Sequence, residues 1–296
     1  MSITQTYQRM IDRASDLPLF QKFNQLNPNV RGAIWLLGSG IFFTAMSVLI
    51  KQASQEFSSF QVAFFRALFG FIVIAPFALR HGVSAVKTAR PGLHLFRGIV
   101  GACVMMAMFY AVARLPLADV TALSFTRPIF LIPLAVLFLG EIVRVRRWTA
   151  TAVGFIGVLI MVRPGSEGID PTVVVALGAS VGLAIITVCV KKLSETETPA
   201  TMLFWSSIML TLCTAFPAWQ VWQTPSWSVI GMAVAMGACG TVGQAMLIRG
   251  YAVGEATAIT PFDYSRLIYS AIAGFIFFSE IPDIMTLAGA AVIVGS

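Results

Sequence analysis

The stretch Pro261-Phe-Asp-Tyr-Ser-Arg266 places an acid, a phenol and a guanidinium within about one helical turn. It lies inside an apolar run from about residue 256 to 278, so a helix that spanned a membrane here would hold these groups near mid-depth. Ionisable groups at that depth cost at least ~2.5–3.5 kcal/mol each on insertion scales, and they usually face a cavity or a partner. Arg127 occupies the matching place in an earlier apolar run, so the chain repeats this costly feature.

The composition is that of a membrane protein. Hydrophobic residues make up 57% of the 296 residues and charged residues only 11%, whereas a soluble domain carries about 25% charged residues. The net charge of +7 does not point to nucleic acid, because the basic residues punctuate the apolar runs instead of forming a patch. We therefore expect a lipid bilayer around the chain and no nucleic-acid partner.

Ten apolar runs come close to the ~20 residues that a spanning helix needs. They predict an all-α membrane protein with ten transmembrane helices, at approximately 33–50, 58–79, 93–113, 118–138, 148–163, 172–190, 199–219, 228–248, 256–278 and 283–296. Residues 1–32 are polar and are expected to form a cytoplasmic tail. Apolar residues at helical spacing from Ile3 to Leu17 favour a short amphipathic helix there, and a disordered tail is the alternative.

The basic residues predict the orientation of these helices. If the N-terminus is cytoplasmic, the inside segments carry fourteen Lys and Arg residues and the outside segments carry three, Lys51, Arg114 and Arg163. Such an excess marks the cytoplasmic side of a membrane. The asymmetry predicts a multi-pass protein of the cell inner membrane with both termini in the cytoplasm.

The chain also repeats itself. Residues 37–51 match residues 177–191 at a shift of 140, and residues 126–141 match residues 265–280 at a shift of 139. The shift is nearly constant, and it aligns Lys, Arg and Glu as well as apolar residues. This favours a real repeat over the chance similarity of hydrophobic helices.

Each repeat unit holds five helices, the first in residues 33–165 and the second in residues 166–296. Because five is odd, the second unit must cross the membrane in the opposite orientation. Inverted repeats are typical of secondary transporters, which bind substrate near mid-membrane between the two halves. The sequence thus predicts two inverted five-helix repeats around a central cavity.

Several motifs resemble the ten-helix EamA group of the drug/metabolite transporter superfamily over nearly all of residues 33–296. They are Tyr110-Ala-Val-Ala-Arg-Leu-Pro-Leu-Ala-Asp-Val-Thr-Ala-Leu-Ser-Phe, Arg127-Pro128-Ile-Phe, Phe138-Leu-Gly-Glu141, Pro261-Phe-Asp-Tyr264 and Phe277-Phe-Ser-Glu280-Ile-Pro-Asp283. The resemblance implies that the third, fourth, eighth and ninth helices surround the cavity, with the fifth and tenth behind as a packing or dimer surface. It implies transport of small metabolites, mostly export, by a monomer or homodimer.

Arg127 and Arg266 are the leading candidates for substrate binding, because a guanidinium recognises a carboxylate in a bidentate way. The alternative is a structural role, with each arginine bound to helix carbonyls or to Asp263. Asp263 could neutralise an arginine, bind a substrate amine or carry a proton. Neighbouring positive charges favour its ionised form, so we expect an ion pair.

Further candidates are neutral. Ser124, Gln244 and Tyr264 are expected to line the cavity or to bond between helices, and Met106 and Tyr110 to form part of an adaptable apolar wall. Pro261 and Pro128 are predicted to be gate hinges or simple kinks. Two more features are interpreted as structural: Arg66 on the second helix, and the packing stripe Gly237, Gly240 and Gly243 on the eighth.

No motif indicates an enzyme, a metal or a cofactor. Cys103, Cys189, Cys213 and Cys239 lie inside apolar runs without a C-x-x-C, and there is no Walker loop or G-x-S-x-G. We expect a secondary transporter that exports amino acids and related small metabolites by alternating access. The alternative is uptake of a larger aromatic or anionic nutrient such as riboflavin or S-adenosylmethionine.

Overall fold

The computed structural model describes residues 23, 25–80, 88–140, 145–162, 170–193, 195–254 and 259–295, and this part of the chain contains helices and no β-strand. The amphipathic helix predicted between Ile3 and Leu17 lies outside the described residues. The described residues of each of the ten apolar runs lie mainly in helix. The helices are α3 Pro28–Ala53, α4 Ser59–Arg80, α5 Pro91–Arg114, α6 Leu117–Ser124, α7 Arg127–Leu139, α8 Val145–Val162, α9 Pro171–Leu193, α10 Pro199–Gln220, α11 Trp227–Val253, η2 Thr260–Tyr264, α13 Ser265–Phe278 and α14 Ile284–Gly295.

Six of the described helical segments are long and apolar enough to cross a membrane. Their bounds are Pro28–Ala53, Pro91–Arg114, Leu117–Leu139, Pro171–Leu193, Thr201–Gln220 and Trp227–Gly250. The shorter segment Ser59–Val73 is also apolar. The expected all-α class is therefore confirmed.

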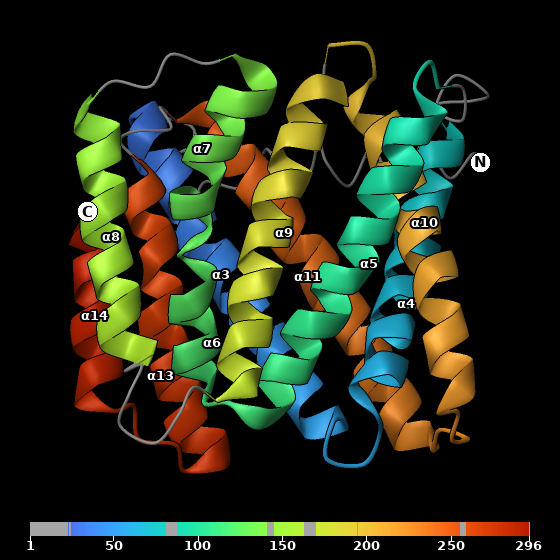
Figure 1. The fold of residues 1–296 in the computed structure, drawn as a ribbon. Helices are drawn as coiled ribbons and strands as arrows, with labels where there is room; N and C mark the ends of the chain where they lie inside the picture. Colours follow the sequence, from blue (N-terminus) through green and yellow to red (C-terminus); the bar gives the residue numbers. More distant parts are fainter. Residues whose placement is uncertain are drawn as a thin grey trace.

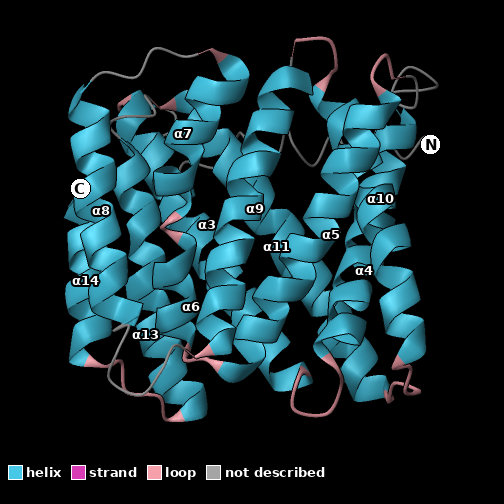
Figure 2. Ribbon diagram, viewed as in Figure 1, coloured by secondary structure: helices cyan, strands magenta, loops and turns pink. Residues whose placement is uncertain are grey.

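The helices pack as a bundle in which neighbours are usually distant in sequence (Figures 1 and 2). Helix α11 runs along α3 and also touches α4, while α9 runs along α5 and α5 also touches α10. Helices α8 and α14 pair at one edge, and α4 and α10 pair at the other. Between these edges, α13 packs on α3 and α6, and α7 packs on α9.

Two of the expected spanning segments are broken near their middle. The first breaks at Phe125–Thr126, between α6 and α7, and Pro128 follows in the first turn of α7. The second begins as the 3₁₀ helix η2, with Pro261 in its first turn, and continues as α13. Proline is tolerated in the first turn of a helix because the amide hydrogen that it lacks has no partner there. Both prolines therefore mark a helix start, and their role as gate hinges stays a prediction.

The glycine stripe on α11 is confirmed as a packing surface. Gly237 lies against Phe69 of α4, where an added Cβ would be 2.9 Å from the Phe69 Cβ and 3.2 Å from its backbone carbon. Gly243 lies against Phe42 and Phe43 of α3, with an added Cβ at 3.3 Å from the nearest atom. Small residues let helix backbones approach closely, which is how helices associate in lipid.

Gly237→Ala is expected to destabilise the bundle by about 1–3 kcal/mol, because the new methyl group meets backbone atoms of α4 that cannot move aside. Gly231→Ala is the matched control on the same helix, since nothing lies within 4 Å of an added Cβ there. Thermal unfolding in detergent measures both. Equal melting temperatures for the two variants would contradict close packing at Gly237.

Candidate functional site

Arg266 projects from α13 onto the face of α3. Its side-chain stem packs on Gly40, where an added Cβ would lie 3.0 Å from the arginine Cγ. The guanidinium carbon lies 4.9 Å from the centre of the Phe43 ring, a cation–π contact. The residue is half-buried. Within the described part of the chain, the guanidinium makes no hydrogen bond.

Asp263 lies one turn before Arg266, in η2. Its Oδ1 atom is buried and has no hydrogen-bond partner in the described residues. The carboxylate acts electrostatically on Arg266, but no ion pair joins it to Arg266 or Arg127 among the residues described. The ion pair expected from the sequence is therefore not formed in this structure. An unpaired carboxylate oxygen and an unpaired guanidinium lie close together instead.

Arg127 stands at the start of α7, immediately after the break in the other segment. It is exposed, as is Pro128 beside it, and it is close enough to Arg266 to act on it electrostatically. The structure thus brings the two arginines of the repeat into the same region. They are not equivalent, because Arg266 is enclosed and Arg127 is open.

The two broken segments touch each other through aromatic and hydroxyl groups. Tyr264 packs edge-to-face on Phe125, with ring centres 5.0 Å apart. On the next turns Thr121 donates a hydrogen bond to the Ser270 hydroxyl at 2.8 Å, and both residues are buried. Ser124 donates to the Thr121 carbonyl at 2.6 Å, within its own helix. These contacts hold α6 and α13 together at the level of the breaks.

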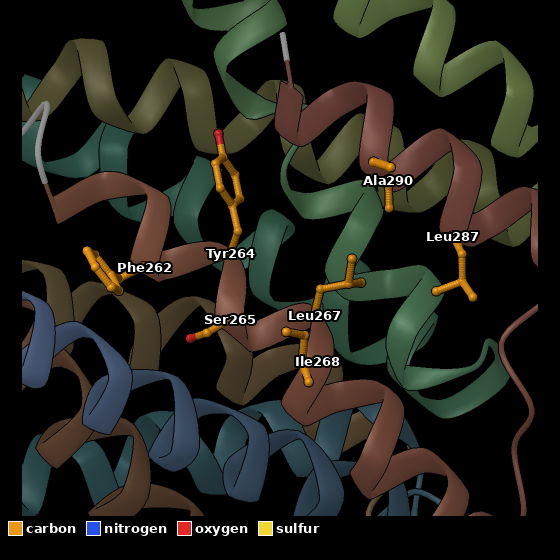
Figure 3. Close-up of a pocket in the computed structure, with 8 residues that line it drawn as sticks. Phe262, Tyr264, Ser265, Leu267, Ile268, Leu287 and Ala290 are labelled. Atoms are coloured by element: carbon orange, nitrogen blue, oxygen red, sulfur yellow. The ribbon is translucent and has the colours of Figure 1, made fainter.

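Helix α13 has a second face that carries a different surface. Tyr264, Leu267, Ile268 and residues of α14 line an apolar cleft of about 370 Å³ (Figure 3). Arg266 is absent from this lining and packs on α3 instead. The cleft offers few groups that could recognise a polar metabolite, so the charged face of α13 is the better candidate site.

One end of the bundle is closed by an ion pair between distant segments. Lys51, at the end of α3, pairs with Glu280 after α13, and it also donates to the Leu115 carbonyl at 2.6 Å. Glu280 accepts a further hydrogen bond from the Leu117 amide at 2.9 Å. The Lys51 and Glu280 side chains are only 12% and 15% exposed. This latch, Lys51–Glu280, joins α3, the α5–α6 connection and α13.

The opposite end is tied by a different set of groups (Figure 1). Glu197, in the connection after α9, accepts hydrogen bonds from the Thr88 hydroxyl at 2.6 Å and the Ala89 amide at 2.8 Å. Burial alone would raise the pKa of Glu197, but these hydrogen bonds and nearby His94 lower it below its usual value. Arg90 forms a more exposed ion pair with Glu195 at 3.5 Å.

The sequence profile of the EamA-like transporter family matches residues 30–163 and again residues 170–296. The chain belongs to this family. An S-adenosylmethionine uptake transporter of Rickettsia felis is 35% identical over 269 residues, which cover 91% of this chain and 92% of that one. A riboflavin transporter of Rhizobium johnstonii is 31% identical over 270 residues (90% and 89%). The pseudopaline exporter CntI of Pseudomonas aeruginosa is 31% identical over 269 residues (89% and 93%).

The fold of this EamA-like transporter also resembles a solved crystal structure of another protein. The two superpose with a TM-score of 0.54 at 18% identity, covering 87% of this chain and 94% of that chain. At this identity the likeness bears on the fold alone. The family places the chain among multi-pass membrane transporters, and it agrees with the resemblance inferred from the sequence motifs.

Three predicted site residues of the EamA-like transporter do not gather around Arg266. Tyr110 lies in a pocket near the C-terminal end of α5, where the Arg114 guanidinium stacks at 3.6 Å from its ring centre. Met106 packs against the main hydrophobic core, and Gln244 is exposed on α11. Their substrate-binding roles stay predictions.

Arg66 is the residue whose surroundings the sequence indicated least well. It was interpreted as structural, snorkelling to the interface or pairing internally. In the structure its guanidinium lies inside the bundle, between α3, α4 and α11, with Nε donating to the Met46 sulfur at 3.4 Å. Gly70 of α4 and Gly240 of α11 pack against this guanidinium, and these two glycines were the only sequence signal that a bulky side chain needs room beside Arg66. Among the described residues no group of three or more His, Cys, Asp or Glu could hold a metal.

Proposed function

We propose that this chain is a secondary transporter that moves a small metabolite with an amino-acid head group by alternating access. Uptake of S-adenosylmethionine is the first candidate activity. The observation that carries the proposal is that Asp263 Oδ1 and the Arg266 guanidinium lie near each other without hydrogen-bond partners among the described residues. A carboxylate would bind Arg266, and an ammonium would bind Asp263. An α-amino acid group carries both.

Alternating access rests on the proposed arrangement of ten transmembrane helices as two inverted repeats, residues 33–165 and 166–296. The packing supports it. A shift of about 140 residues exchanges the pair α3–α11 with α9–α5, and the pair α3–α13 with α9–α7. It also leaves the pairs α4–α10 and α8–α14 unchanged. A two-fold relation between the halves produces such exchanges, and the family profile likewise matches the chain twice.

The relatives support a larger substrate than a free amino acid. Four relatives at 33–35% identity carry the name S-adenosylmethionine uptake transporter. Export of amino acids, the first expectation from the sequence, has no counterpart among their names. S-adenosylmethionine keeps the amino-acid head that fits Arg266 and Asp263. Riboflavin, named for other relatives, has no carboxylate or ammonium for these two groups.

Export remains the second candidate direction, because the pseudopaline relative is named an exporter. A site that both sides of the membrane reach does not encode direction. We retain for this chain the proposed inner-membrane location with both termini in the cytoplasm, which follows from the distribution of Lys and Arg.

Cells that express the full chain are expected to accumulate labelled S-adenosylmethionine from the medium faster than cells that express Arg266→Gln at equal membrane abundance. Efflux from preloaded cells is measured in the same strains and tests export. Unlabelled methionine and riboflavin serve as competitors. If neither uptake nor efflux of S-adenosylmethionine exceeds that of the empty vector, the proposed substrate is wrong.

A further inference from the structure

We propose that Arg66 is a second carboxylate-binding residue on the substrate path, contacting α3 three residues further toward the latch Lys51–Glu280 than Arg266 does. The substrate carboxylate would be held at Arg66 on its way between that end and Arg266. This inference rests on the transport function proposed above. It assigns a binding role to a residue outside the helices that the family resemblance places around the cavity.

The surroundings of Arg66 are built to fit its guanidinium. A Cβ at Gly240 of α11 would lie 2.4 Å from Nη2, and a Cβ at Gly70 would lie 2.6 Å from Nη1. Any other residue at either position would displace the group. The two glycines therefore leave room for the guanidinium inside the bundle, which an arginine that snorkels to the membrane surface does not need.

The charge of Arg66 has no acidic partner in the described part of the chain. Among the described residues, its hydrogen bond goes to the Met46 sulfur, a weak acceptor. The residue is half-buried, so part of its surface is accessible to a small molecule. Arginines inside spanning helices usually pair with an acid or with carbonyls, or they mark a substrate path. The contacts favour the path.

Arg66 and Arg266 border the same face of α3. Arg266 lies over Phe43, and Arg66 lies at Met46, three residues further along the helix. At 1.5 Å per residue these positions are about 4.5 Å apart along the axis. Lys51 follows on the same helix toward the closed end. Positions 43 and 46 share one face of α3, which therefore carries two guanidinium contacts at successive levels between which a carboxylate can pass.

The first test is chemical and needs no substrate. The purified full chain is treated with phenylglyoxal, which modifies accessible arginines, and each site is quantified by peptide mass spectrometry. Arg66 and Arg266 are expected to react. Arg97, a half-buried arginine of α5 that donates to the Met202 carbonyl at 3.1 Å, is expected to react much more slowly. S-adenosylmethionine or succinate is expected to protect Arg66.

The second test measures affinity in Arg66→Gln, in Arg66→Lys and in the control Arg97→Gln. We expect S-adenosylmethionine to bind Arg66→Gln at least about tenfold more weakly than wild type. Arg66→Lys should lose less, because it keeps the charge without the planar fork. Arg97→Gln should bind as wild type does. The labelling of the wild-type chain still tests the proposal if Arg66→Gln does not fold.

The outcomes separate this inference from the proposed function. If wild type binds succinate but not S-adenosylmethionine, and Arg66→Gln no longer binds succinate, the proposed substrate is wrong and the binding role of Arg66 is supported. If Arg66→Gln binds S-adenosylmethionine as tightly as wild type, Arg66 is no binding residue and the proposed function stands. Failure of phenylglyoxal to modify Arg66, or of every carboxylate to protect it, overturns the inference.

Discussion

Arg266→Gln is expected to weaken S-adenosylmethionine binding by roughly 10–100-fold while the helix content stays that of wild type. Hydrogen bonds to charged groups contribute about 1.5–3 kcal/mol, which corresponds to this range. The guanidinium bonds to no acceptor in the described protein, so its removal costs ligand contacts before it costs folding contacts. Isothermal titration in detergent gives the affinity, and circular dichroism gives the helix content.

Two companion variants sharpen this prediction. Arg266→Lys should retain part of the affinity, because it keeps a cation over Phe43 but not the two parallel donors. Asp263→Asn should weaken binding of the amino-acid head but not of a carboxylate without an ammonium group. Wild-type affinity in Arg266→Gln would show that the substrate binds elsewhere.

Glu280→Gln is expected to lower the free energy of unfolding by about 3–5 kcal/mol, because it leaves Lys51 buried without its counter-charge. The glutamine would still accept from the Leu117 amide, so the loss reports the ion pair rather than the helix connection. Thermal and denaturant unfolding in detergent measure it.

The exposed pair Arg90–Glu195 supplies the matched control. Its side chains are 38% and 62% exposed, against 12% and 15% for Lys51 and Glu280. Glu195→Gln should therefore cost no more than about 1 kcal/mol. The double variant Lys51→Met with Glu280→Gln should recover much of the loss, since no buried charge is left alone and the Leu117 amide keeps its acceptor. Equal effects of Glu280→Gln and Glu195→Gln would contradict a latch.

The fold followed from the sequence because a bilayer leaves few choices. Long apolar runs must form helices, since lipid satisfies no backbone hydrogen bond, and each run lies within a helix or a broken helix. The proline positions correctly marked the breaks after Phe125 and around Pro261. Boundaries moved by several residues, as at α3, which begins at Pro28 rather than near residue 33.

The candidate site was less predictable, because a sequence does not say which face of an apolar helix points inward. Arg266 and Asp263 were found because ionisable groups inside a membrane are costly and usually bind a substrate or a partner. The same argument applied to Arg66, but its place about eight residues into the second expected helix favoured a structural interpretation, in which it snorkels to the interface or pairs internally. Tyr110 matched a family motif, yet it stacks with Arg114 near the end of α5. The packing of α3 against α11 and α13 shows which of these side chains point into the bundle.

The central claim is that both ends of this chain open in turn around a site at Arg266. The most direct measurement is exchange of labelled S-adenosylmethionine by proteoliposomes containing the variant Lys51→Cys with Glu280→Cys. A short, cleavable bis-maleimide joins the two thiols across the latch, and wild type treated alike controls for the native cysteines. The account predicts that cross-linking stops exchange and that cleavage restores it. Exchange at the uncross-linked rate with the bridge intact, or no exchange by wild type above empty liposomes, would contradict it.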